Sequence, residues 1–63
     1  MKRRDLIRHL EANDCRLLRE GGSHSISENT KYGKRTAIPR QKEVLSFTAA
    51  SICKQLEITL PKI

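Results

Sequence analysis

His24 directly follows Gly21, Gly22 and Ser23 in the sequence. An imidazole titrates near neutral pH, so it can take or give a proton during a reaction. Glycines allow the backbone to turn tightly and to approach a ligand, and loops of this kind often carry binding or catalytic residues. We therefore predict that His24 does chemistry on a phosphodiester, with the alternative that it only hydrogen-bonds its own loop.

Cleavage of RNA without a metal requires three groups, each with a distinct task. A base removes the proton of a ribose 2′-hydroxyl, an acid protonates the leaving oxygen, and cations stabilise the anionic phosphorane between these steps. Histidine suits either proton transfer, whereas arginine and lysine suit the phosphate. The predicted RNA- or phosphate-binding residues are Arg19, Gly22, Ser23, Lys34, Arg35 and Arg40. No carboxylate stands out in the sequence as an acid partner for His24.

The 63 residues carry 13 lysines and arginines against 7 acidic residues, which gives a formal net charge of +6. Such a charge favours binding to a polyanion such as RNA, although an acidic protein or an anionic membrane surface would also be attracted. A chain of this length forms one domain, residues 1–63, with a thin core for which a partner protein is the expected support. Cys15 and Cys53 are far apart and outside any CxxC pattern, so we predict no metal site and no cofactor.

No apolar run approaches the length needed to span a bilayer, so we expect no membrane association. The basic residues Lys2, Arg3 and Arg4 resemble the start of a signal peptide, but no apolar segment or cleavage site follows them. We therefore expect a cytoplasmic protein.

Two helices are predicted, one near each end of the chain. Residues 2–13 place Leu6, Ile7 and Leu10 on one face, and Asn13-Asp14 can stop the helix by taking a left-handed conformation. Ser46 has the properties of an N-cap for the second helix. Its apolar positions recur at helical spacing and are Ala49, Ile52, Cys53 and Leu56.

The segment between the helices predicts three short strands joined by turns. They cover residues 15–20, from Ser23 to about Glu28, and 35–38. Strict alternation places His24 on the same side of its strand as Ile26, which would direct His24 toward the helices if Ile26 is a core residue. A bulge at Gly21-Gly22 would change that direction.

This order predicts an α+β fold of the type αβββα, with a three-stranded antiparallel sheet and two helices packed on one face. Double-stranded-RNA-binding domains have the same order of elements and recognise RNA by shape and phosphate contacts. The order alone is an analogy and does not establish a function.

Several motifs resemble those of the HicA family of bacterial toxin–antitoxin systems. They are Asn13-Asp14-Cys15, Gly22-Ser23-His24, Lys34-Arg35-Thr36-Ala37-Ile38-Pro39-Arg40 and Ile52-Cys53-Lys54-Gln55-Leu56. The resemblance covers nearly the whole chain, and its most specific part combines the Gly-Ser-His with the later Pro-Arg.

The resemblance implies a double-stranded-RNA-binding-like fold and an mRNA interferase, with His24 as the catalytic histidine. It also implies a HicB-type antitoxin that covers the site in a hetero-oligomeric complex. The chain departs from relatives at three positions: many have a glycine in place of Asp14, many have a histidine in place of Gln41, and some have another histidine in place of Ser25. The first places a non-glycine residue in the turn, and the second removes a histidine that would assist catalysis.

Three functional hypotheses follow. The first is a ribonuclease toxin that acts on mRNA through His24. The second is an RNA-binding module without catalysis, which the net charge and the lack of a second histidine favour. The third is a basic domain that binds only an acidic protein.

Overall fold

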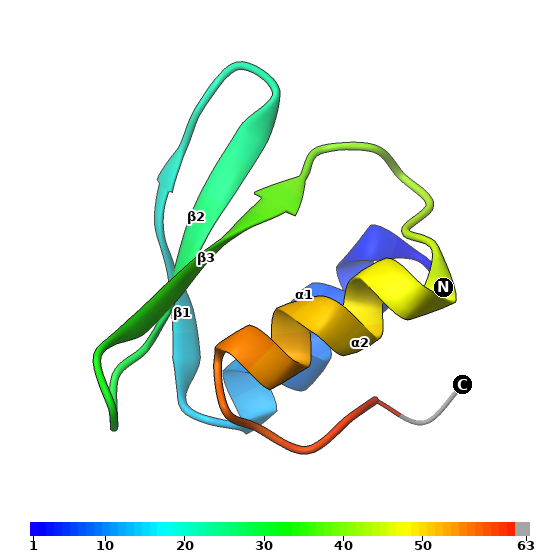
Figure 1. Cartoon of the computed structure of the whole chain (residues 1–63). Coiled ribbons are helices and arrows are strands. Elements are labelled where there is room, and N and C mark those ends of the chain that lie inside the picture. The colour runs from blue at the N-terminus through cyan, green and yellow to red at the C-terminus, as the bar shows by residue number, and fades with distance from the viewer. Residues whose placement is uncertain (62–63) are drawn as a thin grey trace.

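The computed structural model describes residues 1–61, which form two helices and one sheet (Figure 1). The order is α1 (Arg3–Ala12), β1 (Cys15–Glu20), β2 (His24–Asn29), β3 (Lys34–Pro39) and α2 (Ser46–Gln55). The strands pair in the order β1-β2-β3, and both pairings are antiparallel. The two helices lie together on one face of this sheet, so the predicted αβββα, double-stranded-RNA-binding-like fold is confirmed.

Helix α1 begins after Lys2 and ends before Asn13, close to the predicted limits. Leu6 and Leu10 are its buried residues, one turn apart on the face toward the sheet. The chain leaves the helix through Asp14, whose φ of 66° lies in the left-handed region. This confirms that a non-glycine residue makes the turn into β1 here, since Asn and Asp tolerate this conformation better than most residues.

Helix α2 begins at Ser46, so the prediction of Ser46 as its N-cap is wrong. Leu45 is the N-cap instead, with an extended backbone and no side-chain cap hydrogen bond. The carbonyl of Leu45 accepts the first helical hydrogen bond, from the amide of Ala49 at 2.9 Å. A residue without a capping oxygen can occupy this position when packing, rather than capping, holds the helix.

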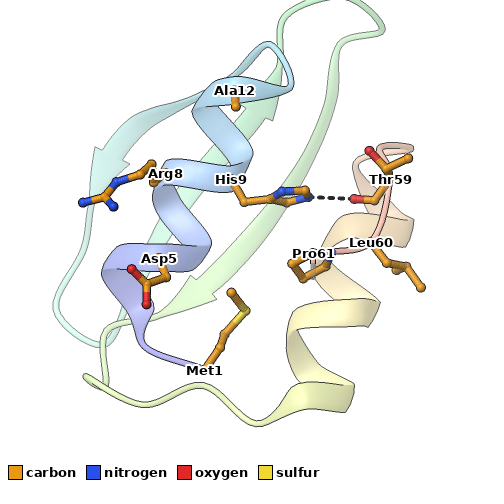
Figure 2. A pocket seen from close by; sticks show the side chains of 8 residues that line it. All are labelled: Met1, Asp5, Arg8, His9, Ala12, Thr59, Leu60 and Pro61. Carbon is orange, nitrogen blue, oxygen red and sulfur yellow. Dashed lines mark hydrogen bonds between the residues drawn. The ribbon is translucent and has the colours of Figure 1, made fainter. Parts of the chain in front are cut away.

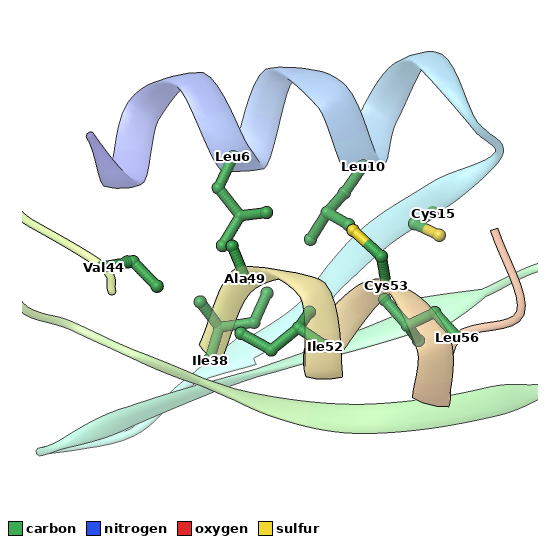
Figure 3. Packing of buried hydrophobic residues seen from close by; sticks show 9 residues of the cluster. All are labelled: Leu6, Leu10, Cys15, Ile38, Val44, Ala49, Ile52, Cys53 and Leu56. Carbon is green, nitrogen blue, oxygen red and sulfur yellow. The ribbon is translucent and has the colours of Figure 1, made fainter. Parts of the chain in front are cut away.

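The core lies between the helices and the inner face of the sheet (Figure 3). Its buried members are Leu6, Leu10, Cys15, Ile38, Val44, Ala49, Ile52, Cys53 and Leu56. All four positions of the predicted α2 stripe are among them. Val44 is buried, whereas its neighbour Leu45 is 65% exposed. Burial is the main cause that raises the pKa of both cysteine thiols above the ordinary value of 9.0.

The inner face of β2 is polar. Ser25, Ser27 and Asn29 are buried there, and Ile26 is only partly buried on the opposite face. Each inward polar group has a partner: the Ser27 hydroxyl donates to the carbonyl of Arg16 at 3.2 Å, and the Asn29 side-chain amide donates to the carbonyl of Leu56 at 2.7 Å. Ile26 is therefore not a core residue, and the strand directs His24 away from the helices.

A bulge interrupts the pairing of β1 with β2. Leu17 lies opposite Ser27 and Arg19 lies opposite Ile26, so Leu18 is the extra residue. The bulge is thus at Leu18 in β1 and not at Gly21-Gly22, the position that the sequence left open. A bulge shifts which residues face each side of a strand. Arg19 consequently shares the outer face of the sheet with Ile26, while Leu17 packs against the core.

Candidate active site

His24 is the first residue of β2, and its side chain is exposed. It pairs with Pro39, the last residue of β3, so it lies at the end of the sheet where β1 ends and β2 begins. The hydroxyl of Ser23 lies 3.2 Å from Nδ1 of the His24 ring. A contact at Nδ1 orients the ring and leaves Nε2 available to a ligand.

The turn before His24 is closed by backbone hydrogen bonds. The amide of Gly21 donates to the carbonyl of His24 at 2.8 Å, and the amide of Arg40 donates to the carbonyl of Ser23 at 3.3 Å. Neither Gly21 nor Gly22 has a left-handed backbone; Gly33 is the one glycine within residues 1–61 with positive φ. A Cβ at Gly21 would lie 2.9 Å from the carbonyl oxygen of His24, whereas one at Gly22 would meet nothing within 4 Å. The close approach of the His24 carbonyl therefore requires a glycine at position 21, whereas a larger residue would fit at position 22.

Arg40 belongs to the same site. Its guanidinium Nη1 donates to the carbonyl of Gly21 at 2.7 Å, and its own backbone is joined to Ser23. The side chain remains exposed. One hydrogen bond uses only part of a guanidinium, which has five N–H donors, so the others can bind an anion. Arg40 thus brings a cation from the β3–α2 connection to the turn that carries His24.

Arg19 reaches this region through the bulge in β1. It lies opposite Ile26, which is two residues along β2 from His24. Because successive residues of a strand alternate faces, His24 and Ile26 share one face, and the residue paired with Ile26 lies on that face too. Arg19 and His24 are therefore on the same, outer face of the sheet. Both side chains are exposed. The structure thus groups Arg19, Gly22, Ser23 and Arg40 around His24.

Lys34 and Arg35 lie toward the other end of the β2–β3 pair. Lys34 pairs with Asn29, five residues from His24, which corresponds to roughly 16 Å along a strand. Both cations have acidic partners: Lys34 Nζ is 3.6 Å from Glu57, and Arg35 Nε is 3.0 Å from Glu28. The structure does not bring these two predicted residues to the histidine.

Arg3 connects α1 to the end of the sheet that carries His24. Its guanidinium donates through Nε to the carbonyl of Pro39 at 3.0 Å and through Nη2 to the hydroxyl of Ser25 at 2.8 Å. The same nitrogen is 3.4 Å from Glu20. In the sequence, Arg3 is only one of several neighbouring basic residues. No local pattern indicates a contact with residues as distant in sequence as Ser25 and Pro39. The basic composition was the one available signal.

His9 does not contribute to this site (Figure 2). Its ring projects from α1 toward the C-terminal segment, where Nε2 lies 2.8 Å from the carbonyl of Thr59. The partly buried ring thus holds the segment that follows α2 against α1.

Residues 1–61 contain no group of three or more histidine, cysteine or acidic side chains placed to hold a metal ion. Within the same residues, no helix has both the length and the apolar character to cross a membrane. The described side chains at this end of the sheet offer an exposed imidazole with a hydroxyl near Nδ1, an arginine bonded to the same turn and a second arginine on the same face of the sheet.

A family model described as the HicA toxin of bacterial toxin–antitoxin systems matches residues 3–58. The chain belongs to the HicA toxin family. The match spans all five secondary-structure elements and includes His24, so this HicA protein is the toxin of a toxin–antitoxin pair. Searches of curated proteins and of solved structures gave no match.

Proposed function

We propose that this HicA toxin is a metal-independent endoribonuclease that cleaves mRNA with His24 as its catalytic residue. The observation that carries the proposal is the exposed imidazole at the end of the sheet, with Ser23 on Nδ1 and Arg40 fixed to the same turn. The family supports a toxin, and the net charge of +6 supports an RNA substrate.

In the proposed reaction, the ribose 2′-oxygen attacks the adjacent phosphorus and the 5′-oxygen of the next nucleotide leaves. His24 acts through Nε2, either as the base that takes the 2′-hydroxyl proton or as the acid that protonates the leaving oxygen. Arg19 and Arg40 stabilise the negative charge that develops on the phosphate oxygens. Ser23 and the backbone at Gly22 help to position these phosphate oxygens. The products are a 2′,3′-cyclic phosphate and a 5′-hydroxyl.

Lys34 and Arg35 are assigned a different task, because they lie away from His24 and are paired with carboxylates. We propose that they contact RNA away from the scissile bond. We also propose that the protein acts in the cytoplasm and that a HicB-type antitoxin binds over the His24 region in a hetero-oligomeric complex.

The proposal is tested with His24→Ala in purified protein and in growing cells. Loss of a general acid or base lowers a rate by about 100- to 10,000-fold, so RNA cleavage and growth arrest should disappear. The circular dichroism spectrum should be unchanged, because the ring is exposed and its one hydrogen bond within residues 1–61 is to its neighbour Ser23. Continued cleavage by the variant would refute the assignment.

His9→Gln is the matched control, since it removes the other histidine and keeps a side-chain amide that can bond to Thr59. It should cleave RNA at the rate of the unmodified protein. Analysis of the cleaved ends adds a second test. A 2′,3′-cyclic phosphate on the 5′ fragment supports the mechanism, whereas a 5′-phosphate on the other fragment indicates metal-dependent hydrolysis.

One observation favours a second candidate, an RNA-binding module without catalysis. Within residues 1–61, no carboxylate and no second histidine hydrogen-bonds to His24, and Gln41 stands where many relatives carry a histidine. A module of this kind would bind RNA with steep salt dependence and leave it intact after long incubation. The cleavage assay with unmodified protein separates the two candidates.

A further inference from the structure

A groove lined almost entirely by cations lies beside the N-terminal end of α1. Its cavity volume is about 610 Å³, and its lining residues are Lys2, Arg3, Arg4, Arg40, Lys42 and Glu43. Five of these six side chains are basic. The groove is also close to the amino end of α1, where the helix dipole adds partial positive charge.

Backbone pairing between two distant segments builds this groove. Lys2 and Glu43 form an isolated antiparallel bridge. The amide of Arg3 donates to the carbonyl of Lys42 at 2.7 Å, and the amide of Val44 donates to the carbonyl of Met1 at 2.8 Å. Cations that are about 40 positions apart in sequence are therefore held side by side without a ligand, which lowers the ordering cost of binding.

The cations of the groove are available to a ligand. Lys2, Arg4 and Lys42 are exposed, and within residues 1–61 none of them forms an ion pair. Glu43 is the one carboxylate in the lining, and it lies 3.8 Å from the terminal ammonium of Met1. Like charges held together in this way attract a polyanion strongly.

The groove is continuous with the candidate active site. Arg40 lines the groove and donates to the carbonyl of Gly21 in the turn before His24. Arg3 also lines it and donates to the carbonyl of Pro39, the residue that pairs with His24. A ligand that crosses Arg40 can therefore occupy the groove and reach His24 at the same time.

The composition of the lining distinguishes nucleic acid from protein as the occupant. The core of a protein interface is enriched in aromatic residues, methionine and arginine and depleted of lysine and acidic residues. This lining contains no aromatic and no aliphatic residue. Lysine and arginine are the residues that contact phosphate oxygens along a nucleic-acid backbone.

We propose that this groove binds the sugar-phosphate backbone of the RNA beside the scissile bond, with Lys2, Arg4 and Lys42 as the phosphate contacts. The proposal rests on the proposed function for the identity of the ligand as RNA. It adds a binding track that predicts where the rest of the substrate lies when one phosphate is at His24.

Arg4→Glu combined with Lys42→Glu tests the groove. Neither side chain has a hydrogen-bond partner within residues 1–61, and a carboxylate in the first turn of α1 suits the helix dipole, so the variant should fold. Binding is measured with a fluorescein-labelled 2′-O-methyl RNA, which lacks the attacking hydroxyl and stays intact. We expect affinity to fall about tenfold or more, and the salt slope of log K to fall by about 0.7 for each lost phosphate contact on a single strand.

Lys31→Glu combined with Lys54→Glu is the control, because it changes the net charge equally on exposed residues outside the groove. Equal losses of RNA affinity in both double variants would overturn the proposal, because the affinity would then depend on the net charge and not on the groove. Loss of antitoxin binding without loss of RNA binding would overturn it too and assign the groove to an acidic protein. If His24→Ala still cleaves RNA but the groove variant alone loses RNA affinity, the catalytic assignment fails and the groove remains.

Discussion

Gly21 and Gly22 are neighbours in sequence but differ in what surrounds them. Only Gly21 lies where an added Cβ would press on backbone, at 2.9 Å from the carbonyl oxygen of His24. That oxygen also accepts a hydrogen bond from the Gly21 amide. The pair therefore offers a comparison in which one methyl group displaces the histidine and an equivalent methyl group does not.

Gly21→Ala should lower the rate of RNA cleavage by up to about a hundredfold, since a misplacement near 1 Å can cost that much. Gly22→Ala should cleave normally, because its Cβ meets nothing within 4 Å. The chemical shift of the His24 amide gives a measurement independent of activity, and it should move only in Gly21→Ala. Similar shifts and rates in the two variants would contradict this account.

At this scale the sequence predicts the turn before His24 but not the contacts that distant residues make around it. The Gly-Gly-Ser-His pattern identifies a turn, and it indicates His24 and Ser23 directly. Arg40 also lies in a recognisable motif. The contacts of Arg3 could not be predicted, because a hydrogen bond to Ser25 depends on how α1 packs on the sheet and leaves no periodic signal.

At the scale of elements, β2 shows why a hydrophobic pattern can mislead. Its inward residues are Ser25, Ser27 and Asn29, so the buried face is polar and the lone apolar residue, Ile26, faces outward. Period-2 alternation was predicted correctly, as His24 and Ile26 do share a side. The direction of that side was left open, because sequence cannot show that each buried polar group finds a partner.

Asn29→Ala should destabilise the fold by about 1–3 kcal/mol, because it removes the partner of two backbone groups. The Asn29 amide donates to Leu56 at the end of α2, and its oxygen accepts from the amide of Lys31 at 2.9 Å. Urea denaturation followed by circular dichroism measures the change in the free energy of unfolding.

Thr30→Ala is the matched control for this position. The exposed Thr30 hydroxyl donates to the carbonyl of Asp14, which also accepts from the Thr30 backbone amide. Loss of the Thr30 hydroxyl leaves the Asp14 carbonyl with its backbone hydrogen bond. The free energy of unfolding should therefore fall clearly less than in Asn29→Ala. An equal cost would show that the link between β2 and the end of α2 does not contribute specially to stability.

At the scale of the whole molecule, a thin core supports a strongly charged surface. Within residues 1–61, the core cluster consists of nine buried residues, in a chain with a net charge of +6. Periodicity and turn residues, which are local signals, predict the order of elements, the antiparallel sheet and most of the core. Local signals do not separate Val44, which is buried, from the exposed Leu45, because an apolar pair in an irregular connector carries no period to show which residue turns inward.

The two buried cysteines make the free energy of unfolding decrease as pH rises in the alkaline range. Burial raises the pKa of both thiols above 9.0 in the folded protein, with smaller contributions from Asp14 at Cys15 and from Cys15 at Cys53. The unfolded thiols ionise first as pH rises, so the stabilisation is complete below 9.0 and is lost as pH rises toward the folded values.

Between about pH 8 and about pH 10, the urea concentration at the unfolding midpoint should therefore fall more for the unmodified protein than for a variant with Cys15→Ala and Cys53→Ala. The variant should be less stable at the lower pH, since it loses buried volume, but its pH dependence should be flatter. Lysine titration affects both proteins equally. Parallel declines would contradict a role for the thiols.

The extra residue Leu18 in β1 has a consequence for aligning this chain with its relatives. In a regular ladder without a bulge, the same sequence would pair Leu18 with Ile26 and Arg19 with Ser25, which would turn Arg19 toward the helices and put a leucine on the outer face. A relative that lacks the extra residue would form that regular ladder with its own residue at the position of Arg19 still opposite the equivalent of Ile26. An alignment should therefore place a gap in this strand at Leu18, because a gap elsewhere exchanges outward-facing and inward-facing positions.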